Sequence, residues 1–298
     1  MASRRHAATS PALPQPVALT PFRSSADGQG IWLPAGRPVR GYPALFETTL
    51  VPPGGSAAAG IAWMDTRLLG ARLYSGSSSP GRGPYAFSPP VRPAEAATLV
   101  AAFNGGFKMK EARGGYYTDG RVVYPLRPGA ASLVIYTNGS VGLGAWGQDV
   151  QMTPLVASVR QNLVPLVAAG RPTAAAERPW QAWGSTCGAR SCAASVPGVG
   201  HQWRSGLGIT SMGALIYVVG PALGPLQLAS LLVRAGAMRA MQLDINPYWP
   251  TFVSYDPSLP GGLASPANGQ RLLAATVQGP ATFFTHGWAR DFITLSAR

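Results

Sequence analysis

Short apolar runs separated by turn residues dominate the hydrophobic pattern of this chain. Asp-Gly lies between two such runs at 118–120, and Asn-Gly lies between two more at 137–140. These dipeptides favour β-hairpins when they are flanked by apolar runs. The pattern therefore predicts a protein rich in antiparallel strands, with the runs at 46–51, 60–64, 71–74, 100–103, 115–117, 121–124, 131–136, 141–146, 206–210, 215–219, 240–243, 251–255, 282–285 and 292–295.

Helices are predicted at three places. Pro93 suits the first position of a helix over 94–100, and Gly236 suits a left-handed cap after a helix over 226–235. A third helix, interrupted by a proline, is predicted over 154–168. Antiparallel hairpins combined with a few packed helices predict an α+β fold with mixed, largely antiparallel sheets.

The domain organisation follows from length and composition. The chain has 298 residues, and 46% of them are hydrophobic, which supports a sizeable core. Residues 1–30 contain many proline and polar residues and are expected to be a disordered tail or linker. Residues 31–298 are expected to form a single domain.

Two segments of the chain share one order of features. In each, a predicted helix leads into an apolar run, 100–103 or 240–243, which ends in small polar residues. Polar residues at the ends of buried strands often form sites, although Asn-Gly is also a common turn. The repetition favours a site built from Asn104, Gly105, Gly106, Asp244 and Asn246.

Four motifs follow one another along the chain: Asn-Gly-Gly-Phe at 104–107, a glycine-bearing strand with an arginine at 204–210, an apolar strand at 214–219, and Leu-Asp at 243–244. Their order resembles that of the phosphodiester glycosidase domain family. The resemblance covers roughly 94–255. One departure is that the family follows Leu-Asp with a Gly-Gly-Gly-Ser turn, where this chain has Ile-Asn-Pro-Tyr-Trp at 245–249.

The resemblance implies hydrolysis of a sugar-1-phosphodiester in an envelope glycopolymer or glycan. Ordinary glycoside hydrolysis uses two carboxylates, but a phosphate monoester leaves with little need for protonation, so one carboxylate and cations suffice. The implied catalytic residues are Asp244 as base or nucleophile, Arg204 on the phosphate, and Asn104. The implied substrate-binding residues are Gly105, Gly106, Phe107, Lys108, Asn246, Tyr248 and Trp249. The alternative is a non-catalytic module on the same fold that binds anionic polysaccharide.

The charge balance points to an anionic partner. The formal net charge is +13, and Lys108 and Lys110 are the only lysines among 24 basic residues. A basic surface suits nucleic acid, anionic lipid or an anionic polymer. The arginines are scattered and no nucleic-acid-binding motif is present, so we expect an anionic or phosphate-linked glycan and no nucleic acid. The sequence does not indicate an oligomeric state.

Cysteine and histidine usage bears on compartment and cofactors. Cys187 and Cys192 lie in a loop-like stretch and predict a disulfide, which favours an extracytoplasmic location. The sequence contains no run of 18 apolar residues, so we predict no membrane span. No signal peptide or anchor is evident. With three histidines and no phosphate-binding or dinucleotide fingerprint, we expect no metal and no cofactor.

Overall fold

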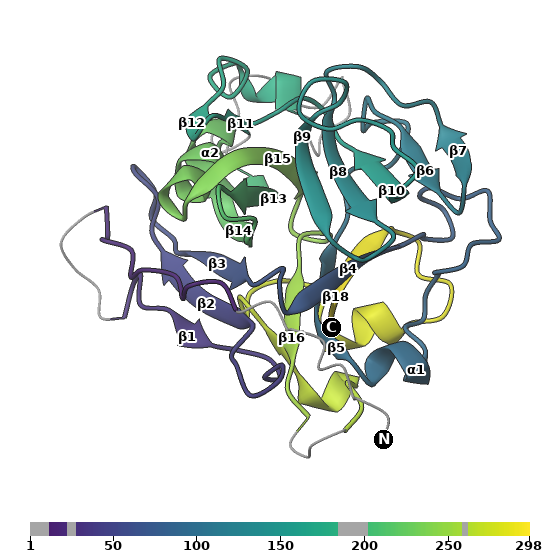
Figure 1. Cartoon of the computed structure of the whole chain (residues 1–298). Coiled ribbons are helices and arrows are strands. Elements are labelled where there is room, and N and C mark those ends of the chain that lie inside the picture. Colours follow the sequence, from purple (N-terminus) through teal and green to yellow (C-terminus); the bar gives the residue numbers. More distant parts are fainter. Residues whose placement is uncertain (1–11, 23–27, 184–201, 258–261) are drawn as a thin grey trace, which may run out of the picture.

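A computed structural model describes residues 12–22, 28–183, 202–257 and 262–298. Its strands form three sheets, in which every pair of neighbouring strands is antiparallel (Figure 1). The largest sheet has eight strands. Its spatial order is β1 (Leu33–Pro34), β2 (Leu45–Leu50), β3 (Ala59–Met64), β14 (Leu215–Leu223), β13 (Gln202–Thr210), β15 (Ala237–Ile245), β11 (Val167–Ala168) and β12 (Arg171–Pro172).

The two smaller sheets have five strands each and lie to one side of the large sheet (Figure 1). One has the order β7 (Arg121–Tyr124), β6 (Tyr116–Thr118), β10 (Val156–Gln161), β8 (Ala131–Tyr136) and β9 (Val141–Ala145). The other has the order β17 (Gly269–Arg271), β16 (Phe252–Tyr255), β5 (Leu99–Asn104), β18 (Phe292–Ala297) and β4 (Leu69–Tyr74).

Two α-helices occur in the described residues. α1 (Pro93–Ala96) is a single turn, and α2 (Pro225–Arg234) packs its apolar face onto β13, β14 and β15. Close packing depends on a glycine in β13, because a Cβ on Gly206 would lie 3.1 Å from a methyl of Leu232. Among the residues that the structure describes, no helix is long and apolar enough to cross a membrane. Three 3₁₀ turns span Trp180–Trp183, Pro266–Asn268 and Pro280–Phe284.

The predicted α+β class is wrong, because the fold is largely β. The run at 94–100 gives one helical turn before Leu99 starts β5, whose residues are all buried between β16 and β18. The predicted helix at 154–168 is instead β10 and β11. In both places, pairing with strands distant in sequence outweighs the local helical signal. The predicted strand at 282–285 lies in a 3₁₀ turn.

The hairpin predictions are confirmed. The Asp-Gly turn joins β6 to β7, and both turn residues have positive φ, 53° at Asp119 and 73° at Gly120. The Asn-Gly turn joins β8 to β9, where Asn138 Oδ1 accepts a hydrogen bond from the Ser140 backbone N–H at 2.9 Å. The helix predicted at 226–235 is also confirmed, as α2.

The chain before β1 contacts the body of the protein within 12–22. Leu13 is buried, and its backbone N–H donates to Asp65 Oδ2 at 2.7 Å. Asp65 lies in the turn between β3 and β4.

Candidate active site

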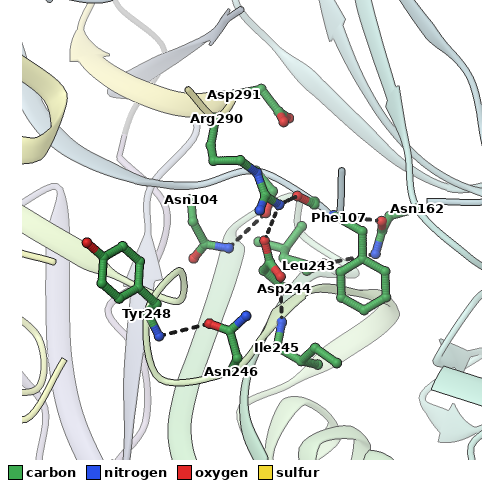
Figure 2. Close-up of polar contacts among 12 residues, drawn as sticks. Asn104, Phe107, Asn162, Leu243, Asp244, Ile245, Asn246, Tyr248, Arg290 and Asp291 are labelled. Carbon is green, nitrogen blue, oxygen red and sulfur yellow. Dashed lines mark hydrogen bonds and ion pairs between the residues drawn. The ribbon is translucent and has the colours of Figure 1, made fainter. Parts of the chain in front are cut away.

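Polar side chains from all three sheets meet where several strands begin or end (Figure 2). Asp244 is the penultimate residue of β15 in the large sheet. Arg290 and Asp291 directly precede β18 of one small sheet, while Arg160 is near the end of β10 in the other. These four charged side chains are all buried, so each needs a partner within the protein.

Asp244 is a buried carboxylate that is held in a fixed position. It is 4% exposed, and its Oδ1 accepts the Ile245 backbone N–H at 2.8 Å. Its Oδ2 accepts a hydrogen bond from Arg290 Nη2 in a buried ion pair. Burial raises the pKa of Asp244 to about 7, although Arg290 and the Ile245 N–H act in the opposite direction. Asp244 is therefore close to half-ionised near neutral pH.

Arg290 connects the carboxylate to the Asn-Gly-Gly-Phe segment. Its Nη2 also donates to the Gly106 carbonyl at 2.7 Å, and its guanidinium carbon lies 4.6 Å from the centre of a Trp249 ring. Within the described residues, its Nε has no hydrogen-bond partner. The guanidinium thus keeps donor capacity beyond what Asp244 and Gly106 use.

A second buried ion pair supports the first. Arg160 Nε donates to Asp291 Oδ2 at 2.7 Å, and the two side chains are 1% and 0% exposed. Arg160 also donates to the carbonyls of Gln161, at 2.6 Å, and Phe107. Every donor-bearing nitrogen of Arg160 is therefore used, which a buried charge requires.

The two glycines of the motif leave room for this second pair. A Cβ on Gly105 would lie 2.1 Å from Asp291 Oδ2, and a Cβ on Gly106 would lie 3.0 Å from the guanidinium carbon of Arg160. The first distance is too short for a real Cβ, the second is tighter than most real Cβ contacts, and the Asp291 and Arg160 atoms involved belong to the buried pair. The Gly-Gly sequence thus lets the ion pair pack against the backbone.

Asn162 ties the motif to the strand that carries the carboxylate. Its Oδ1 accepts the Phe107 N–H at 3.0 Å, while its Nδ2 donates to the carbonyls of Gln242 and Leu243, each at 2.9 Å (Figure 2). This amide fixes the distance between 105–107 and the end of β15.

A cleft of about 450 Å³ opens beside Asp244. Four basic and two acidic side chains line it, and both lysines of the chain are among them. The acidic groups are Asp244 and the exposed Glu111, which lies 3.9 Å from Lys110. The lining consists of Phe107, Lys108, Lys110, Glu111, Arg113, Leu163, Asp244, Ile245, Asn246, Trp249 and Arg290.

Five residues of the predicted site line this cleft together: Asp244, Phe107, Lys108, Asn246 and Trp249. Asn246 has a left-handed φ of 82°, which asparagine tolerates better than most residues. Its side-chain oxygen accepts the Tyr248 N–H at 2.9 Å and closes the turn. Residues 246–248 therefore form an Asx turn.

Tyr248 and Asn104 are not part of the cleft lining. Tyr248 is 53% exposed, and its ring points away from Asp244 (Figure 2). Asn104 is 7% exposed and makes four hydrogen bonds within the protein. Its Nδ2 donates to Gly105 O and Ser205 Oγ, and its Oδ1 accepts from Tyr217 OH and the Thr251 N–H, at 2.8, 3.0, 2.6 and 3.1 Å. Asn104 joins Asp244 and Arg290 only in a small enclosed hollow behind the cleft.

Arg204 lies deeper in the large sheet and does not line the cleft. It is fully buried and donates to the Leu223 carbonyl at 2.8 Å and to Gln242 Oε1 at 2.7 Å. Burial lowers its pKa to about 10. Its Nη2 has no hydrogen-bond partner in the described part of the chain.

No group of three His, Cys, Asp or Glu side chains that could hold a metal occurs among the described residues. Cys187 and Cys192 lie outside the described residues.

Sequence reasoning missed four residues of the assembly: Arg160, Asn162, Arg290 and Asp291. The signal for Arg290 and Asp291 was present, because this charged pair directly precedes the apolar run of β18 in a chain with only 11 acidic residues. Arg160 and Asn162 follow the apolar start of β10, but that stretch was interpreted as a helix.

Among the comparisons with known proteins, one solved structure supports the fold. No family model matches the sequence, and no curated protein matches it. Among solved structures, the catalytic domain of zebrafish N-acetylglucosamine-1-phosphodiester α-N-acetylglucosaminidase, auto-inhibited by its pro-peptide, is similar to this chain. The TM-score is 0.50 at 16% identity, over 89% of this chain and 87% of that one. The two proteins share a fold. A protein from Synechocystis is similar with a TM-score of 0.44 at 12% identity, over 89% of this chain and 64% of that one.

Proposed function

We propose that this protein is a hydrolase that cleaves a sugar-1-phosphodiester bond, and that it acts outside the cytoplasm on an envelope glycopolymer or glycan. One observation carries the proposal. A buried carboxylate with a pKa of about 7, Asp244, faces a cleft in which four of the five other charged side chains are basic. A carboxylate poised near the working pH suits base catalysis, and clustered cations suit a phosphate. The fold shared with a phosphodiester glycosidase agrees with this assignment.

The reaction requires one proton acceptor and a site for a leaving phosphate. Asp244 takes a proton from water as the water oxygen bonds to the anomeric carbon. The bond between that carbon and the bridging oxygen breaks, and its electron pair leaves with the phosphate monoester. Because the second pKa of such a monoester is about 6, the leaving group needs no general acid. The products are the free sugar and the phosphate monoester.

Arg290 and Lys108 are the groups we assign to the phosphate. Arg290 lines the cleft beside Asp244, and its guanidinium is held in place by Asp244, Gly106 and Trp249. Lys108 lines the same cleft, and its side chain is exposed. A guanidinium matches phosphate oxygens through its planar fork, while an ammonium adds a mobile point charge. Both groups stabilise the negative charge that develops as the monoester leaves.

The proposal is tested by measuring sugar release from a panel of sugar-1-phosphodiesters that differ in sugar and in anomeric configuration. We expect release from at least one compound, together with an equal amount of phosphate monoester. Saturable binding of anionic glycans without release from any compound would contradict the hydrolase and favour a binding module.

The pH dependence follows from the pKa of Asp244. The base is active only when ionised, and its pKa is raised to about 7. We therefore expect kcat/KM to rise with pH through about 7 and to level off above it. A steady-state profile with the free enzyme measures this. A profile that is flat across this range, or that falls with increasing pH, would rule out Asp244 as the ionised base.

Trp249 is expected to position the sugar. Its ring lies over the Arg290 guanidinium, makes T-shaped contacts with Tyr248 and Trp288, and is part of the cleft lining. We expect Trp249→Ala to raise KM about tenfold, equivalent to about 1.4 kcal/mol, with a smaller change in kcat. Trp249→Phe should restore most of the affinity. Unchanged KM in the alanine variant would exclude this role.

A further inference from the structure

A second hollow lies beside the proposed catalytic cleft. It has a volume of about 320 Å³, and Arg113 and Leu163 line both it and the cleft, so the two are neighbours. Its lining adds two more arginines, Arg127 and Arg178, and includes no acidic side chain. All charged side chains that line this hollow are therefore positive.

The positive charge of these two cavities is largely uncompensated. Six basic and two acidic side chains line the two cavities. Each acidic group already has a partner: Asp244 pairs with Arg290, and Glu111 lies near Lys110. Within the described part of the chain, no ion pair is formed by the remaining four basic residues, Lys108, Arg113, Arg127 and Arg178.

The walls of the second hollow are tied to the same framework as the active site. Gln161, next to Arg160, accepts the Arg127 N–H at 2.8 Å and donates to the Arg127 carbonyl at 3.2 Å. Trp183, which also lines the hollow, is held by Gln242, whose Nε2 donates to the Trp183 carbonyl at 2.9 Å. The backbone of Arg127 is therefore tied to β10, the strand that also carries Arg160.

We infer that the substrate is a polymer of phosphodiester-linked sugar repeats, and that the second hollow binds the anionic repeats next to the one that is cleaved. This inference rests on the proposed function. A single phosphodiester carries one negative charge, which Arg290 and Lys108 match. The guanidinium groups of Arg113, Arg127 and Arg178 match further phosphates of the same polymer, and arginine is suited to bind phosphate bidentately.

The experiment uses synthetic oligomers of hexose-1-phosphodiester repeats, from a single repeat to chains long enough to reach Arg178. The full-length protein is compared with Arg127→Gln/Arg178→Gln. The matched control is Arg40→Gln/Arg72→Gln, which removes the same charge from two exposed arginines outside both cavities. Dissociation constants and sugar release are both measured, each at low and at moderate salt.

We expect the wild type to bind the long oligomer at least tenfold more tightly than the single repeat, with a stronger salt dependence. The Arg127/Arg178 variant should lose most of that gain and bind the single repeat unchanged, whereas the control should behave as the wild type. Affinity independent of length, or equal losses in both variants, would overturn the inference. Equal binding of polygalacturonate of matched length would overturn the assignment to phosphate. Length-dependent binding without sugar release would support the binding of adjacent repeats in the second hollow but contradict the proposed hydrolase activity.

Discussion

Asp244→Asn is expected to lower kcat about a thousandfold or more on any sugar-1-phosphodiester that the wild type cleaves. The amide keeps the size of the side chain and its contact with the Ile245 N–H, but it cannot accept a proton or attack the anomeric carbon. General base catalysis alone contributes about 10² to 10⁴ in rate. KM should change much less, because the phosphate is held by Arg290 and Lys108. Steady-state kinetics of the purified variant measure both quantities.

The matched control is Glu111→Gln, which removes the other carboxylate that lines the cleft. Glu111 is exposed and lies 3.9 Å from Lys110, so we expect a change in kcat of less than about threefold. Full activity of Asp244→Asn, or an equal loss in both variants, would contradict the assignment of Asp244 to the chemistry.

Asp291→Asn is expected to destabilise the fold by about 3–5 kcal/mol, because breaking a buried pair leaves an uncompensated charge. The Arg160 side chain is 1% exposed and has no access to water as a substitute partner. The loss should appear as a lower urea midpoint with an unchanged slope. Activity at a temperature where the variant is folded should fall as well, since Asp291 lies against Gly105 and Arg160 holds the Phe107 carbonyl.

The comparison for this prediction is Arg239→Ala, which breaks the exposed pair between Arg239 and Asp149. Those side chains are 46% and 31% exposed, so we expect a loss below about 1 kcal/mol. If Asp291→Asn lowered the free energy of unfolding no more than Arg239→Ala, this would contradict a stabilising role for the buried pair between Arg160 and Asp291.

The strands were predictable because their signals are local. The Asp-Gly and Asn-Gly turns fix the β6–β7 and β8–β9 hairpins without help from the rest of the chain. The helix at 94–100 was wrong because β5 takes its character from β16 and β18, which lie more than a hundred residues further along. From the sequence alone, a buried apolar run of this length is compatible with either a helix or a strand. The predicted α+β class was wrong for this reason.

The residues of the candidate site were likewise predictable only in part. Asp244 stood out because a carboxylate at the end of an apolar strand is costly unless it has partners, and the structure supplies Arg290. Arg204 was predicted to bind the phosphate, but in the structure it is buried and hydrogen-bonded to Leu223 and Gln242. The local sequence does not indicate which face of the sheet is open to solvent. The support from Arg160 and Asn162 depends on contacts between sheets, which a single sequence does not reveal.

The measurement that tests the central claim most directly is hydrolysis in ¹⁸O-labelled water. If water attacks the anomeric carbon, the released phosphate monoester contains no ¹⁸O, and the label enters the sugar hydroxyl. The account predicts this outcome for the wild type and the loss of product with Asp244→Asn. Label in the phosphate would mean that the phosphorus–oxygen bond breaks instead, and it would contradict the proposed glycosidase chemistry at Asp244.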